Sequence, residues 1–372
     1  MSIQGTCDPA FAPVADVFGN SVATGAERGA LCLRVNGRNV VNLFGGMAQP
    51  ETDMPWRSDT LACCFSVTKG MFALLAHVLI DKGILKPDTR VMDIWSGFGT
   101  AGKDRLTVYD VLTHRAGLPA VSGNVSPGLL YDRSGMEAAL ATSAPVVSIG
   151  TPVYHNMTYG YLLGGILARV GGAPVEDLIE RELTGPLDAD FRIGLGRSDM
   201  ARTATLSQDD PNALFAALDA DPESLFARSM QFFGRGEDFN SVRWQQSVIG
   251  SGNGHATAAA IAIVYEQLIA PDGLLSADRQ HALRCEVCRS DSVDPIMGMA
   301  IRYGEGVELS TPAALDFGPN PATVGYWGAG GAQGFADPDS GLVFGYVTGR
   351  MDAALGTSAR AAALVAAAYQ CL

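Results

Sequence analysis

Apolar residues form strand-like runs near both ends of this chain and helix-like runs through its middle. Two of the strand-like runs flank Asn36-Gly37, a dipeptide that favours a tight hairpin turn. Near the other end, Pro338 and Gly341 lie in a turn-prone segment between two further runs. The predicted strands are residues 29–35, 38–46, 326–336 and 342–348.

Helical patterns fill most of the remaining chain. The clearest is residues 71–80, which are apolar except for His77 and contain no Pro or Gly, so we expect a buried helix that ends by Gly83. Further helices are expected near residues 8–22, 106–114, 157–170, 174–183, 256–269, 276–288 and 359–370.

This order of elements predicts an α/β (α+β) fold in which one antiparallel sheet is built from both chain ends. The predicted sheet domain is discontinuous, with residues 1–60 and 296–372, and residues 61–295 form a mostly helical domain inserted between them. A site in the cleft between the two parts is the expectation.

The charge and the apolar content of the chain limit the classes of partner that it can bind. The 372 residues carry a formal net charge of −13 and are 47% apolar, which argues against nucleic acid and anionic membranes as partners. The first residues lack the basic and apolar regions of a signal peptide, and no apolar run is long enough to span a membrane. We therefore expect a cytoplasmic protein with seven reduced cysteines and a small-molecule substrate; the oligomeric state stays open.

Candidate chemistry begins at the start of the 71–80 helix. Ser66 and Lys69 stand three residues apart, so both lie on one face if the helix opens at Ser66. A serine becomes a nucleophile when a base takes its proton, and a buried lysine with a lowered pKa can serve. Taken alone, the pair is also explained by a helix cap followed by a solvated lysine.

Two other segments could complete such a site. Tyr154 and Asn156 alternate, so both side chains can face one side of an extended segment. Tyr326-Trp327-Gly328-Ala329 lies on a predicted strand, where Gly328 would let the backbone approach a bound ester. Packing roles explain each segment equally well when it is considered separately.

Together, Ser66–Lys69, Tyr154–Asn156 and the strand carrying Gly328 resemble the serine β-lactamase and penicillin-binding-protein superfamily. They are most similar to family VIII carboxylesterases, the esterases related to class C β-lactamases. Matching segments include Leu112-Thr113-His114-Arg115-Ala116-Gly117-Leu118-Pro119, Asn253-Gly254-His255 and Gly330 through Pro338, so the resemblance spans nearly the whole chain.

The resemblance implies that Ser66 is acylated, with Lys69 and Tyr154 as its proton-transfer partners and Asn156 near the substrate. The amides of Ser66 and Ala329 would bind the oxyanion. Which of Lys69 and Tyr154 is the base stays open, and a Lys69 charge would lower the phenol's pKa. No cofactor is implied.

One departure concerns the substrate. β-Lactamases and transpeptidases begin the third motif with Lys, and many relatives with His, whereas this chain has Tyr326 followed by Trp327. Without that cation, a substrate carboxylate loses a charge-assisted bond worth about 1.5–3 kcal/mol. We expect hydrolysis of small neutral esters; the alternatives are an amidase, peptidase, transesterase or weak β-lactamase at the same site, or a scaffold without activity.

Other signals carry less weight. Residues 97–103 resemble a phosphate-binding loop, but Asp104 replaces the required Ser or Thr. Cys285 and Cys288 form a C-x-x-C pair without the second ligand pair of a zinc site, so we expect no metal. His114 has no G-x-S-x-G serine as a partner and is expected to be structural.

Overall fold

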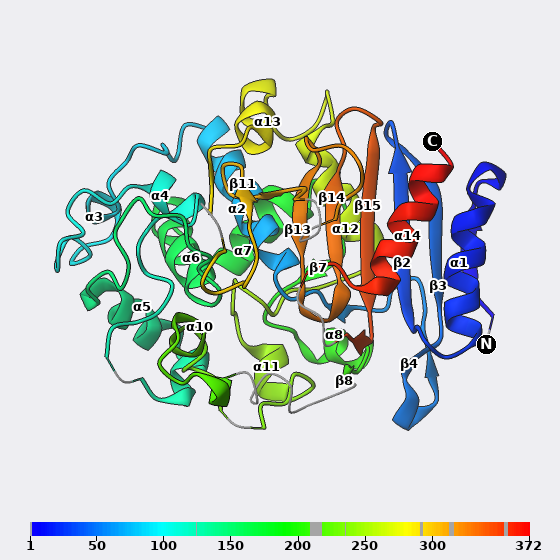
Figure 1. The fold of residues 1–372 in the computed structure, drawn as a ribbon, viewed down its shortest axis with the longest axis horizontal. Coiled ribbons are helices and arrows are strands. Elements are labelled where there is room, and N and C mark those ends of the chain that lie inside the picture. Colours follow the sequence, from blue (N-terminus) through cyan, green and yellow to red (C-terminus); the bar gives the residue numbers. More distant parts are fainter. Residues whose placement is uncertain are drawn as a thin grey trace.

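A nine-stranded antiparallel sheet forms one side of the molecule, and helices form the other (Figure 1). The computed structural model describes residues 2–123, 125–208, 218–234, 236–290, 293–311, 316–352 and 356–372. The strands of the large sheet follow the order β1-β3-β2-β15-β14-β13-β12-β11-β10, so strands from the two chain ends meet where β2 pairs with β15.

The strands of this sheet are β1 (Gln4–Cys7), β2 (Gly29–Val35), β3 (Arg38–Gly45), β10 (Cys288–Arg289), β11 (Arg302–Tyr303), β12 (Glu308–Leu309), β13 (Val324–Trp327), β14 (Gln333–Ala336) and β15 (Leu342–Thr348). Short strands outside it are β4 (Met47–Gln49), β5 (Met54–Pro55), β6 (Ala62–Cys63), β7 (Phe191–Arg192), β8 (Ser207–Gln208), β9 (His255–Ala256) and β16 (Arg350–Met351).

The helices of the sheet side are α1 (Ala12–Ala23), α12 (Ala258–Tyr265) and α14 (Ala359–Gln370). The other helices are α2 (Val67–Asp81), α3 (Val91–Ile94), α4 (Val108–Leu112), α5 (Arg133–Thr142), α6 (Thr158–Gly171), α7 (Val175–Ile179), α8 (Arg197–Ala201), α10 (Leu225–Ser229), α11 (Val242–Gln246) and α13 (Ala277–Arg284). Single turns are η1 (Pro9–Phe11), η2 (Pro50–Thr52), η3 (Pro127–Tyr131), η4 (Glu180–Thr184), η5 (Glu266–Leu268) and η6 (Ala329–Gly331).

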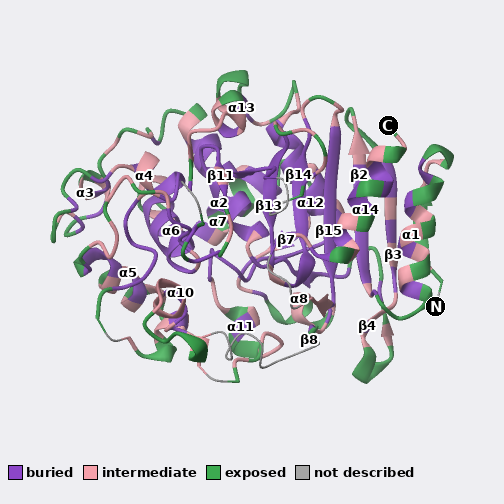
Figure 2. Ribbon diagram, viewed as in Figure 1, coloured by how far each residue is buried: buried purple, intermediate pink, exposed green. Residues whose placement is uncertain are grey.

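Helix α2 is central to the fold. Thirteen of its residues, from Val67 to Leu79, are buried, and it packs against both α6 and β13 (Figure 2). Helices α1 and α14 pack on each other beside β3, and α12 packs on β2 and β15. The buried α2 therefore joins the helical side to the sheet and brings its first turn to the boundary between them.

The predicted fold class is confirmed, and the Asn36-Gly37 hairpin forms with both residues at positive φ, 48° and 82°. Two predicted elements were wrong in detail. The strand expected at 326–336 is two strands, because η6 interrupts it. The helix expected at 276–288 ends at Arg284, and Cys288 pairs in strand β10 of the large sheet instead.

Among the described residues, no helix combines the length and apolar composition needed to cross a membrane.

Candidate active site

Ser66 lies at the first turn of α2, at the end of a tightly fixed segment. The Cys64 amide donates to the Gly254 carbonyl at 2.9 Å, and the Gly254 amide donates to the Thr68 hydroxyl at 3.0 Å. Between them Phe65 has φ of +43°, a left-handed conformation that is strained for a bulky residue. This sharp turn presents Ser66 at the N-terminal end of the helix, where the helix dipole favours negative charge.

Lys69 is fully buried one turn after Ser66. Its Nζ lies 3.0 Å from the Ser66 Oγ and 2.8 Å from the Ser251 carbonyl oxygen. Burial lowers the pKa of Lys69 to about 7, although the charge of Glu308 acts in the opposite direction. Because the Ser251 carbonyl can only accept, a neutral amine that donates there can keep its lone pair for the Ser66 proton.

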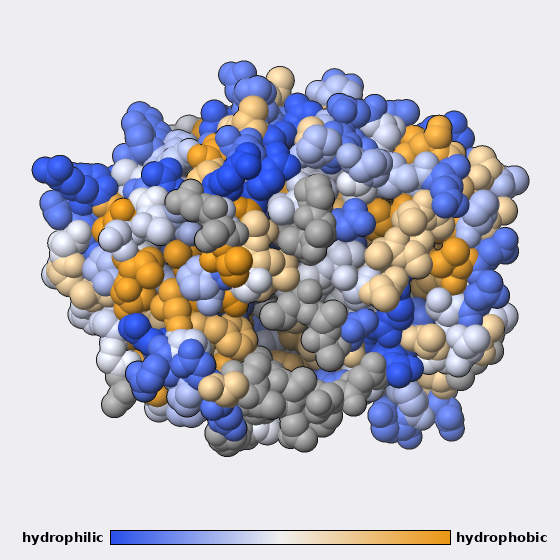
Figure 3. Space-filling model, in the orientation of Figure 1, coloured by the Kyte–Doolittle hydropathy of each residue, from blue (hydrophilic) through white to orange (hydrophobic). Residues whose placement is uncertain are grey.

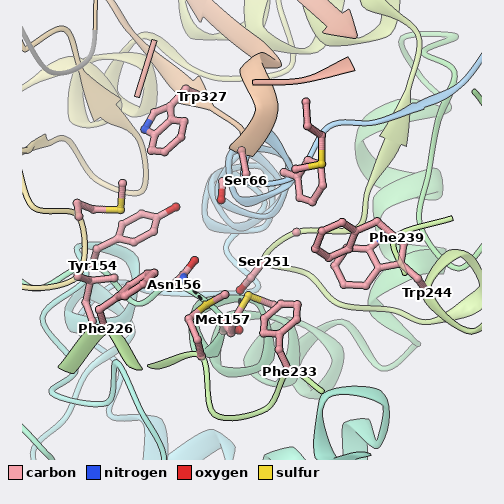
Figure 4. Close-up of a pocket in the computed structure, with 17 residues that line it drawn as sticks. Ser66, Tyr154, Asn156, Met157, Phe226, Phe233, Phe239, Trp244, Ser251 and Trp327 are labelled. Carbon is pink, nitrogen blue, oxygen red and sulfur yellow. Dashed lines mark hydrogen bonds between the residues drawn. The ribbon is translucent and has the colours of Figure 1, made fainter. Parts of the chain in front are cut away.

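Tyr154 forms the opposite wall, and its hydroxyl points into the cavity toward Ser66 (Figure 4). The Lys69 Nζ lies 5.0 Å from the centre of the Tyr154 ring. The phenol oxygen is buried and makes no hydrogen bond with a described residue. This places the hydroxyl, the amine and the phenol of three chain segments around one crevice.

The net effect of the surroundings on the phenol is opposite to the contribution expected from a charged Lys69. Burial raises the pKa of Tyr154 well above its usual value, and Glu308 raises it further, whereas the Ser66 side chain acts to lower it. A buried Lys69 with a pKa of about 7 carries little charge above neutral pH to offset this. Tyr154 is therefore a neutral phenol at neutral pH, and the free amine of Lys69 is the stronger candidate for the base.

Gly328 allows a close approach of backbones beside the nucleophile. A Cβ at this position would lie 2.3 Å from the Cys64 carbonyl oxygen, which is shorter than any normal contact. Gly328 therefore packs β13 against the segment that carries Ser66, and the next residue, Ala329, reaches the cavity wall. Ser66 and Ala329 therefore line the same cavity.

Tyr326 and Trp327 point in opposite directions because side chains alternate along β13. Trp327 lines the cavity, whereas Tyr326 is fully buried behind it, with its hydroxyl 3.0 Å from the His114 Nε2. The expectation that Tyr326 contacts the substrate is therefore wrong, because its side chain does not line the cavity. The His114 Nδ1 accepts a hydrogen bond from the His155 amide, so the neutral ring carries its hydrogen on Nε2 and donates it in the hydrogen bond to the Tyr326 hydroxyl. The His114 ring also stacks on the Tyr154 ring, with 5.1 Å between the ring centres.

The cavity in front of Ser66 has a volume of about 140 Å³ and an apolar lining. Asn156 also lines it, and its side-chain amide donates to the Met230 sulfur at 2.9 Å. Apolar side chains also gather on the helical side of the visible surface (Figure 3). The described lining residues are Phe65, Ser66, Tyr154, Asn156, Met157, Phe226, Met230, Phe233, Phe239, Trp244, Ser251, Gly252, Ile296, Met297, Trp327, Ala329 and Met351, none of which is charged.

Sequence reasoning missed two residues that hold the site together. Ser251 accepts from Lys69 through its carbonyl, and its hydroxyl donates to the Met157 carbonyl at 2.7 Å. Asp294 is buried, and it accepts from the Tyr154 amide at 2.8 Å. A serine or an aspartate in a loop gives no local signal for such a contact, since its partner lies far away in the sequence.

Lys103, the C-x-x-C pair and Asn253 are the other residues singled out by the sequence. Lys103 of the phosphate-loop-like segment is buried and donates to the Ser143 carbonyl. Cys285 and Cys288 are free thiols, and within the described residues no group of three or more His, Cys, Asp or Glu side chains is arranged to hold a metal ion. Asn253 lies outside the cavity, where its buried amide bonds to the backbone of Ile249 and Trp244.

Comparisons with known proteins show which family the chain belongs to. A family model described as Beta-lactamase matches residues 14–368. The chain is 31% identical over 367 residues to the esterase/beta-lactamase LipL of Mycobacterium tuberculosis (strain ATCC 25618 / H37Rv), covering 94% of this chain and 83% of LipL.

Two solved structures are also similar over the full length of both chains. One is a penicillin-binding protein homologue from Caulobacter crescentus, with 33% identity and a TM-score of 0.88. The other is a family VIII carboxylesterase, with 32% identity and a TM-score of 0.87. The chain therefore belongs to the beta-lactamase family, as the motifs at Ser66, Tyr154 and Tyr326 indicated.

Proposed function

We propose that this protein is a serine carboxylesterase that cleaves small neutral esters through an acyl-enzyme on Ser66. The observation that carries the proposal is the 3.0 Å contact between the Lys69 Nζ and the Ser66 Oγ, at the wall of an apolar cavity with no charged lining residue among those described. The similarity to a family VIII carboxylesterase and to an esterase/beta-lactamase supports the same reaction class.

Acylation begins when the Ser66 Oγ attacks the ester carbonyl carbon while its proton passes to the neutral Lys69 amine. The oxyanion that forms is bound by the Ser66 and Ala329 amides, near the positive end of α2. The neutral phenol of Tyr154 then donates its proton to the leaving alkoxide and is reprotonated from the Lys69 ammonium. The alcohol leaves, and the acyl group stays on Ser66.

Deacylation repeats these transfers with water as the nucleophile. The Lys69–Tyr154 pair, neutral again, takes a proton from water as its oxygen attacks the acyl carbon. Collapse of the second oxyanion returns a proton to the Ser66 Oγ and releases the carboxylic acid. No net proton is gained by the enzyme over the cycle.

The shape and polarity of the cavity favour a neutral substrate with a short acyl group. A volume of about 140 Å³ accommodates an apolar group close to the size of benzene. None of the described lining residues offers a cation to a substrate carboxylate, and the Tyr326 hydroxyl is occupied by His114. A β-lactam carboxylate would be desolvated without compensation, so we propose weak or absent β-lactamase activity.

Hydrolysis of p-nitrophenyl acetate and butyrate tests the proposal. Ser66→Ala is expected to abolish hydrolysis, and Tyr154→Phe to reduce kcat by about 10²–10⁴-fold, because the proton donor to the leaving group is lost. Intact mass should show one fluorophosphonate adduct on the wild type and none on Ser66→Ala. Matched amide substrates and penicillin separate an esterase from an amidase or β-lactamase; penicillin turnover without ester hydrolysis would refute the substrate class.

A further inference from the structure

The hydroxyl of Tyr154 is directed at the cavity without a hydrogen bond of its own. Its oxygen is buried and has no partner among the described residues, yet it points toward Ser66 (Figure 4). The direction of the phenol is therefore set by the contacts that hold the Tyr154 backbone and ring. Because a displacement of about 1 Å can cost about 10²-fold in rate, these contacts bear on the reaction.

Three successive backbone amides fix the chain at Tyr154. The Val153 amide donates to the His114 carbonyl at 3.1 Å, and the His155 amide donates to the His114 Nδ1 at 3.0 Å. The Tyr154 amide between them donates instead to the Asp294 Oδ2 at 2.8 Å. Two separate segments of the chain, one carrying His114 and the other Asp294, therefore hold the backbone of the proton donor.

The second oxygen of Asp294 holds part of the cavity wall. Its Oδ1 accepts from the Ile296 amide at 2.9 Å and from the Met297 amide at 3.0 Å, and both of these residues line the cavity. The Asp294 carbonyl also accepts from the Gly298 amide at 2.8 Å, which closes the turn. One buried carboxyl thus joins the segment of the proton donor to the neighbouring wall of the cavity.

We propose that Asp294 is a positioning residue that directs the Tyr154 hydroxyl at the leaving group and keeps the Ile296–Met297 wall in register with it. In the step concerned, the phenol O–H bond breaks and an O–H bond forms on the leaving alkoxide, while Asp294 gains and loses no proton. The inference rests on the proposed function, because it concerns the proton that Tyr154 gives to the alcohol.

The role requires two acceptor oxygens at fixed positions rather than a net charge. Burial raises the pKa of Asp294, and the three amides that donate to its side chain act to lower it. Asparagine has the same shape, but one of its two ends is an NH₂ donor. In Asp294→Asn that donor would face either the Tyr154 amide or the amides of Ile296 and Met297, so one of the two connections is lost.

The test compares two butyrate esters that form the same acyl-enzyme but differ in their leaving group. Ethoxide must be protonated as it leaves, whereas p-nitrophenolate is stable without a proton, so only the ethyl ester depends strongly on the proton donor. In Asp294→Asn, kcat/KM should fall about 10²-fold for ethyl butyrate and less than about tenfold for p-nitrophenyl butyrate. Rates are expressed per active site labelled by fluorophosphonate, which removes any contribution from unfolded protein.

Two further variants separate positioning from stability. Asp337→Asn is the matched control, since Asp337 is also buried and accepts from the Asp339 amide at 2.9 Å, two residues later, but does not line the cavity; it should keep the wild-type ratio of the two esters. Asp294→Ser retains an acceptor for the turn, but its single oxygen cannot also reach Tyr154, so it should lower the ratio as Asp294→Asn does.

A double-mutant cycle with Tyr154→Phe completes the test. If Asp294 acts through the phenol, Asp294→Asn should add little to the loss of ethyl butyrate hydrolysis that Tyr154→Phe already causes. Independent, multiplicative losses would overturn the inference, as would an unchanged ester ratio in both Asp294 variants or an equal change in Asp337→Asn. These outcomes leave the proposed function intact if Ser66 of the wild type is labelled, whereas a wild type without labelling or ester hydrolysis would refute both.

Discussion

The close packing at Gly328 makes a single methyl group a sharp test of the oxyanion hole. In Gly328→Ala the new Cβ would start 2.3 Å from the Cys64 carbonyl oxygen and 3.2 Å from the Phe65 Cβ. Both neighbours belong to the constrained turn before Ser66, so neither can rotate away as a side chain could. Relief requires the end of β13 and the nucleophile segment to separate by about 1 Å, a displacement that costs about 10²-fold in rate when it misplaces reacting groups.

The expected result is a fall in kcat of about 10²–10³-fold, the loss seen when one oxyanion donor is removed. KM should change little, because the apolar lining that holds the substrate remains in place. Stopped-flow hydrolysis of p-nitrophenyl butyrate measures both parameters, and urea unfolding shows that the variant is folded.

Gly196→Ala is the matched control, since a Cβ there meets no heavy atom of the described residues within 4 Å and its φ of −78° suits alanine. It should keep wild-type kcat. A wild-type kcat in Gly328→Ala would refute the reasoning, because the Ala329 amide could then be moved without consequence.

Two further predictions concern the base and the loop behind it. Because Lys69 must be neutral to accept the Ser66 proton, kcat/KM for a neutral ester should rise with pH about a midpoint near 7 and be lost below it; a flat profile from pH 5 to 9 would contradict this assignment. Asn253→Ala removes buried hydrogen bonds to the backbone of Ile249, Trp244 and Ser247, and at about 1 kcal/mol each should lower the free energy of unfolding in urea by about 3 kcal/mol. An unfolding free energy within 0.5 kcal/mol of the wild type, on the order of a neutral surface substitution, would count against that role.

The parts of the site that sequence could indicate are those with local patterns. Ser66 and Lys69 are related by one helical turn, and the apolar residues after them predict that the turn is buried. The Asn36-Gly37 hairpin likewise follows from the conformational freedom of two adjacent residues. Both predictions need no knowledge of the rest of the chain.

The remaining contacts depend on distant partners. Alternation along β13 separates Tyr326 from Trp327, but which of the two faces the cavity depends on how the sheet packs against α2. Ser251 joins the site only because its carbonyl accepts from the buried Lys69, which lies far from it in the sequence. Burial also reverses the expected effect on Tyr154, since desolvation of a phenol cannot be judged from a motif.

The burial of α2 connects the stability of this fold to its chemistry. With its ordinary pKa of 10.5, a lysine would be neutral in roughly one molecule in three thousand at pH 7, whereas a pKa of about 7 leaves roughly half of the molecules with a free amine. Desolvation thus increases the fraction of molecules with a neutral Lys69 amine by about three orders of magnitude. A buried lysine that is unprotonated or unpaired nevertheless stabilises the fold less than an apolar side chain would. The same packing that excludes water from Lys69 therefore carries a stability cost, which the apolar residues of α2 offset.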